Sequence, residues 1–112
     1  MVKVAMLAQS RYARDALILL GQLIREGRIA RRMTTAELAS RAGISRALLY
    51  RIERGDPTCR IGAVFEAAAI AGVVLFEEER DAVLGRLDRS EEKLALMPKS
   101  VRSPKKAVKD AF

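Results

Sequence analysis

The stretch that decides the fold is TTAELASRAGISRALLYRIERGDP, residues 34–57. It begins with the pattern of a capping box, in which Thr34 accepts a hydrogen bond from the amide of Glu37 and the Glu37 side chain reaches back to the cap. Gly43 is the residue best able to adopt a positive φ, and it therefore ends the first helix. Ser45 then suits the N-cap of a second helix. The stretch predicts two short helices joined by a tight glycine turn.

Small and apolar residues fall where the inner faces of these two helices meet. Ala39 is small at the position where the helices cross closely. The other inward positions are Leu38, Ala42, Ile44, Leu49 and Ile52. Two short helices, a glycine turn, two caps and this inner face together match the helix-turn-helix unit. The sequence therefore predicts a DNA-binding motif.

The flanking sequence is also helical in pattern. Residues 11–32 carry Leu17, Leu20 and Ile24 at helical spacing without a proline. An alanine-rich run at 61–71 predicts a further helix that Gly72 ends. Residues 73–76 are a short β-prone run that the sequence leaves open as a strand or a turn. The three glutamates at 77–79 suit the first turn of another helix, and Ser90 predicts the restart of a final helix that ends near Met97.

Composition and charge narrow the function. The chain has 112 residues, which fits one small domain, and its net charge of +7 favours a polyanion as partner. The excess lies at the two ends, since residues 1–32 carry +5 and residues 98–112 carry +4, while residues 77–97 carry −3. Residues 98–112 contain two prolines and few apolar side chains, which predicts a flexible basic tail.

Several classes of protein fit this composition poorly. The chain has no His and a single cysteine, Cys59, so the common zinc arrangements and a disulfide are not expected, and neither are catalytic residues or a cofactor. No apolar run is long enough for a membrane span, and residues 1–9 match a signal peptide poorly, which predicts a cytoplasmic protein. The prediction is therefore a DNA-binding protein and not an enzyme; a protein-interaction adaptor with solubilising ends is the weaker alternative.

Residues 34–57 resemble the helix-turn-helix of the Xre, or Cro/C1-type, family of bacterial and phage repressors, and the resemblance extends over about residues 14–72. It implies an all-α, compact bundle of about five helices, like the DNA-binding domain of lambda repressor. It also implies a homodimer that binds double-stranded operator DNA of two-fold symmetry. The outward face of the recognition helix would then consist of Ser45, Arg46, Ala47, Tyr50 and Arg51.

The resemblance implies a role for individual residues. Thr35 would contact a backbone phosphate, and Arg46 and Arg51 would read bases, with phosphate contact as the alternative for both arginines. Glu53 would pair with Arg28 and hold the reading helix, although Arg28 could also contact phosphate.

For two further arginines and for Tyr50, two roles are possible. Arg54 and Arg25 are phosphate partners or exposed charges without a role. Tyr50 would stack on or brace the DNA backbone, or serve only as a packing residue.

A second resemblance lies C-terminal to the motif. The segments VVLFEEERD and LALMPKSVRSPKKAVKDAF are similar to those of HipB-like antitoxins, which repress their own operon and bind a HipA-like toxin kinase. Residues 11–72 would be the DNA-binding domain, 73–97 a dimerisation extension and 98–112 the tail. The basic tail would meet either the toxin or DNA, and docking on the toxin would involve Arg102, Lys105, Lys106 and Phe112. A solvated tail with an incidental Phe112, on a stand-alone Xre-family regulator, is the alternative.

Overall fold

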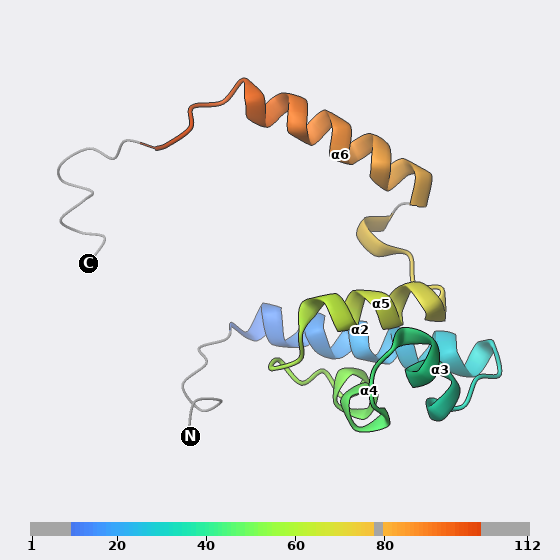
Figure 1. Cartoon of the computed structure of the whole chain (residues 1–112). Helices are drawn as coiled ribbons and strands as arrows, with labels where there is room; N and C mark the ends of the chain where they lie inside the picture. Colours follow the sequence, from blue (N-terminus) through green and yellow to red (C-terminus); the bar gives the residue numbers. More distant parts are fainter. Residues whose placement is uncertain (1–9, 78–79, 102–112) are drawn as a thin grey trace. The chain divides into compact units, whose positions relative to one another are not determined.

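The computed structural model describes residues 10–77 and 80–101 of the chain (Figure 1). These residues form five α-helices and one short 3-10 turn, and no strand occurs among them, which confirms the all-α prediction. The helices are α2 (Arg11–Ala30), α3 (Thr35–Ala42), α4 (Arg46–Glu53), α5 (Ile61–Ala71) and α6 (Arg80–Ala95). The chain divides into two compact units, Met1–Glu77 and Glu78–Phe112, which are described separately below.

Short polar caps set the ends of α3 and α4, as the sequence predicts. Thr34 Oγ1 accepts from the amide of Glu37 at 3.0 Å, and Glu37 Oε1 accepts from the amide of Thr34 at 2.8 Å. Gly43 ends α3 with φ of 71°, a left-handed conformation that a side chain would strain. Ser45 Oγ accepts from the amide of Leu48 at 3.0 Å at the start of α4. Local chemistry thus places the turn between the two helices.

The core of the first unit lies among α2, α3, α4 and α5 (Figure 1). Both α2 and α3 contact α4 and α5. Ile24 of α2, Leu38 of α3 and Leu49 of α4 are completely buried, and the alanines of α5 pack against them. Because aromatic residues are absent from this core, the helices approach closely over small and branched side chains.

Arginine and glycine join the C-terminal ends of α2 and α5. Arg31 Nε donates to the carbonyl of Ala71 at 3.0 Å, and its guanidinium lies against Gly72, which ends α5 at φ of 84°. Gly27 of α2 packs directly against the carbonyl of Ala71. A side chain at either glycine would collide with these groups, so the two helix ends are held together at the backbone level.

Residues 73–76, which the sequence leaves open between strand and turn, form no strand, and the last two of them belong to a turn. A 3-10 turn covers Leu75–Glu77, and Phe76 has a positive φ of 57°. The Phe76 ring packs edge-on against Phe65 of α5, with ring centroids 6.4 Å apart and an angle of 87° between the planes. This conformation is uncommon for an aromatic residue, and the ring contact partly offsets its cost.

The second unit contains α6, a single helix of 16 residues. The predicted restart at Ser90 is wrong, since the helix runs through Ser90 without interruption. The sequence between Arg86 and Met97 contains no glycine or proline that would break the backbone hydrogen bonds, so a mid-helix serine is tolerated. Leu84, Leu87 and Leu94 of α6 are all more than half exposed.

Candidate DNA-binding surface

Two buried residues orient α4. Leu49 and Ile52 are 0% and 3% exposed and fix one side of the helix in the core. The residues on the opposite side are therefore directed to solvent, and those with exposed side chains are Arg46, Ala47, Tyr50 and Arg51, followed by Arg54 at the C-cap. The structure thus brings the predicted outward face of the recognition helix together on one exposed surface, beside its exposed N-cap Ser45.

An ion pair fastens the last turn of α4 to α2. Arg28 Nε donates to Glu53 Oε2 at 2.8 Å, and Arg28 Nη2 donates to Glu53 Oε1 at 3.3 Å. Arg28 Nη1 also donates to the carbonyl of Met33 at 3.1 Å. The two charged side chains are only 11% and 8% exposed. This guanidinium therefore makes a two-pronged contact inside the protein, in the geometry that favours a strong pair.

Gly21 lets the backbone of α2 pack closely against the last turn of α4, next to the ion pair. A Cβ added at Gly21 would lie 2.6 Å from the carbonyl oxygen of Ile52 and 2.7 Å from that of Glu53. Only glycine lets α2 approach the last turn of α4 this closely. Gly21 is not among the predicted site residues, and its one local signal is a glycine inside an otherwise regular helical pattern.

Arg51 is tied to the turn that follows α4. Its Nε donates to Asp56 Oδ2 at 3.0 Å and its Nη2 donates to Thr58 Oγ1 at 2.8 Å. Hydrogen bonds from the hydroxyl and amide of Thr58, together with Arg51, lower the pKa of Asp56 to about 2. The same bond to Asp56 raises the pKa of Arg51, which stays charged. No local pattern in the sequence marks Asp56 or Thr58 as a partner of α4.

Tyr50 and Arg54 form a second linked pair on the exposed surface. Arg54 Nη1 donates to the Tyr50 hydroxyl at 3.0 Å, and the guanidinium carbon lies 5.2 Å from the centre of the Tyr50 ring. Tyr50 is 59% exposed, so the ring braces the arginine and is not a core residue. Both groups can still reach a ligand outside the protein.

The N-terminus of α3 carries Thr35 as its first helical residue, with an exposed side chain. The adjacent capping box places the Glu37 carboxylate on the amide of Thr34. This carboxylate already complements the positive end of the helix dipole. A phosphate at this terminus would therefore approach a site that is partly neutralised.

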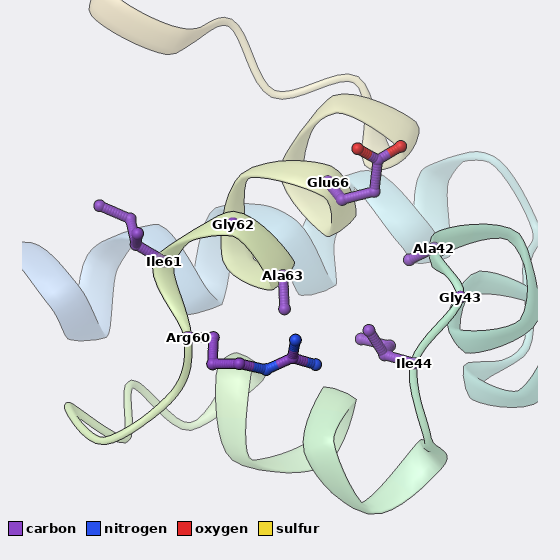
Figure 2. Close-up of a pocket in the computed structure, with 8 residues that line it drawn as sticks. All are labelled: Ala42, Gly43, Ile44, Arg60, Ile61, Gly62, Ala63 and Glu66. Atoms are coloured by element: carbon purple, nitrogen blue, oxygen red, sulfur yellow. The ribbon is translucent and has the colours of Figure 1, made fainter.

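A hollow of about 680 Å³ lies beside the turn between α3 and α4. It is bounded by the turn residues Gly43 and Ile44 and by the start of α5. Figure 2 shows the Arg60 guanidinium extending toward Ile44, while Ile61 points away. Arg60 thus adds a positive group next to the helix-turn-helix, one that the sequence analysis did not select.

The residues predicted to dock on a partner cannot be placed in the fold. Arg102, Lys105, Lys106 and Phe112 lie outside the described residues. Among residues 10–77 and 80–101 there is no group of three acidic, His or Cys side chains that could hold a metal ion.

The single cysteine, Cys59, is partly buried, and this burial raises the pKa of its thiol. No helix in the described ranges is long and apolar enough to cross a bilayer.

Two short helices joined by a left-handed glycine, with the second helix anchored inward and arginine-rich outward, define a helix-turn-helix protein. A scan against protein families matches residues 19–83, more than half of the chain, to the helix-turn-helix domain family. The chain belongs to this family, which makes it a DNA-binding regulator of a typically non-enzymatic class. Searches of curated proteins and of solved structures found no match.

Proposed function

We propose that the protein is a sequence-specific transcriptional repressor of the Xre type, and that α4 is its recognition helix. The observation that carries this proposal is the exposed surface of α4, where Arg46 and Arg51 flank Tyr50 opposite the buried Leu49 and Ile52. An arginine fork can bond both major-groove acceptors of guanine, which gives about 1–3 kcal/mol of discrimination against a wrong base.

The roles of the other residues follow from their contacts. The linked pair of Tyr50 and Arg54 suits a backbone phosphate, and the exposed Thr35 at the start of α3 suits another phosphate. Arg28 is committed to Glu53 and to the carbonyl of Met33, and its side chain is nearly buried. We therefore assign Arg28 to holding α4 in place and not to a phosphate.

Selection from a library of random DNA duplexes tests this function. The parent protein should enrich one sequence, and Arg46→Ala should relax the preference at individual base pairs while its circular dichroism is unchanged. Arg25→Ala is the matched control on the exposed side of α2, because loss of a phosphate contact would weaken all duplexes alike. Recovery of no preferred sequence by the parent protein would refute the assignment.

We further propose that the protein acts as a homodimer on a two-fold operator. Helix α6 supports this, since Leu84, Leu87 and Leu94 are all more than half exposed and an isolated helix of its length is marginal in water. Sedimentation at micromolar concentration should give twice the chain mass, and Leu87→Glu should shift the protein to monomer. A parent that stays monomeric on operator DNA would contradict the proposal.

The resemblance to HipB-like antitoxins supports a partner for the second unit, and we propose a HipA-like toxin kinase. In this proposal residues 11–72 bind DNA, residues 73–97 dimerise and residues 98–112 dock on the kinase. A kinase-like gene adjacent on the genome favours the antitoxin, and its absence favours a stand-alone regulator. Retained neutralisation of the kinase by a chain that ends at residue 97 would refute the docking role of the tail.

A further inference from the structure

The guanidinium of Arg51 has two edges, and the protein occupies only one of them. The side edge consists of Nε and Nη2, and the end edge consists of Nη1 and the second N–H of Nη2. Asp56 accepts from Nε and Thr58 accepts from Nη2, so the side edge is filled. Within the described part of the chain the end edge has no acceptor, and the Arg51 side chain is 46% exposed. The free edge has the geometry that guanine O6 and N7 require.

The two acceptors are themselves fixed. Thr58 donates to Asp56 Oδ1 through its hydroxyl at 2.6 Å and through its amide at 2.8 Å. The turn that carries them passes over α2, because a Cβ at Gly55 would lie 2.8 Å from the Cα of Ile18. The backbone of the turn that carries Asp56 and Thr58 is therefore packed against α2, and Thr58 in turn holds the Asp56 carboxylate.

We propose that Asp56 and Thr58 are positioning residues, which hold the side edge of Arg51 so that its end edge meets a guanine in the major groove. This inference rests on the proposed role of α4 as the recognition helix. An arginine held in advance loses less rotamer freedom on contact. Asp56 also offsets the charge of Arg51, which weakens attraction to any phosphate and leaves directed hydrogen bonds to a base as the main contribution.

The test compares discrimination by variants of the full chain on one pair of duplexes. Selection from a random library first gives the preferred duplex, and Arg51→Ala identifies the base pair that Arg51 reads. Discrimination is the ratio of affinities for this duplex and for the duplex changed at that pair. We expect Arg51→Ala to lower the ratio by about tenfold, and Asp56→Asn and Thr58→Val to lower it by about three- to tenfold, the cost of ordering one long side chain.

Asp15→Asn is the matched control, because it removes one exposed carboxylate of the same unit and changes net charge equally. Its ratio should equal that of the parent, because the affinity gained from the lost negative charge is the same for both duplexes. Since the ratio is measured on one preparation, a partly unfolded variant does not imitate a loss of discrimination.

The outcomes separate the two proposals. If Asp56→Asn and Thr58→Val keep the ratio of the control, the positioning role is overturned while the repressor assignment stands. If Arg51→Ala leaves the ratio of affinities unchanged, Arg51 does not read a base and the inference also fails. A parent that selects no sequence overturns both proposals together.

Discussion

Removing the charge of Glu53 tests how α4 is held. Glu53→Gln keeps the shape of the side chain but leaves the Arg28 guanidinium without its counter-ion, in a place where the two side chains are 11% and 8% exposed. Breaking a buried pair on one side costs about 3–5 kcal/mol. Because Arg28 keeps its bond to the carbonyl of Met33, we expect the lower end, about 3 kcal/mol of unfolding free energy.

Urea denaturation followed by circular dichroism measures this loss, with an unchanged m-value as the sign of unaltered two-state unfolding. Glu26→Gln is the matched control, since Glu26 is exposed on α2 and its substitution should change stability by no more than about 0.5 kcal/mol. A double variant, Arg28→Met with Glu53→Leu, should recover most of the loss, because it leaves no uncompensated charge.

A double-mutant cycle is built from Arg28→Met, Glu53→Leu and the variant that carries both. Because each single variant leaves a buried charge unpaired and the double variant leaves none, the two single losses should sum to more than the loss of the double variant, by at least about 2 kcal/mol. A loss of unfolding free energy below about 1 kcal/mol for Glu53→Gln would refute the role of this buried ion pair in holding α4. Strictly additive losses in the cycle would refute it as well.

Two other perturbations follow from the same unit. Gly21→Ala should lower the unfolding free energy by more than about 1 kcal/mol despite the better helix propensity of alanine, since its Cβ meets two carbonyl oxygens of α4, whereas the control Gly62→Ala, with nothing within 4 Å, should not. Asp56 has a folded-state pKa of about 2 against an ordinary 3.8. Its contribution to stability is therefore present above pH 3.8 and lost as the pH falls toward 2. The melting temperatures of parent and Asp56→Asn should thus converge over that range, and a carboxyl carbon resonance of Asp56 that titrates near 3.8 would contradict this.

The helix ends could be predicted from sequence because they depend on neighbouring residues. Thr34, Gly43 and Ser45 each act within three residues of their own position, and their side chains or backbone freedom are sufficient to stop or start a helix. The same local rule failed at Ser90, where a good capping residue lies inside a helix that nothing interrupts. A cap signal therefore predicts an end only where the neighbouring sequence also breaks the helical pattern.

The junctions between helices could not be predicted in this way. Gly21 matters because of where α4 crosses α2, and that crossing depends on the whole core. Arg28 and Glu53 are 25 residues apart, and only a family resemblance pointed to them. Arg51 could be placed on the outward face of its helix only through the family resemblance. Its partner Asp56 could not, since the path of the turn after Gly55 decides where that carboxylate lies.

These contacts change what the net charge of +7 means for binding. Arg28 is neutralised inside the unit, Arg31 is bound to the carbonyl of Ala71, and Arg51 is balanced by Asp56. Arg46 makes no ion pair within the described part of the chain. The salt dependence of DNA binding reports the number of phosphates neutralised by free cations. It should therefore be shallower than the arginine count suggests, because much of the positive charge near α4 orients side chains and does not attract the DNA backbone.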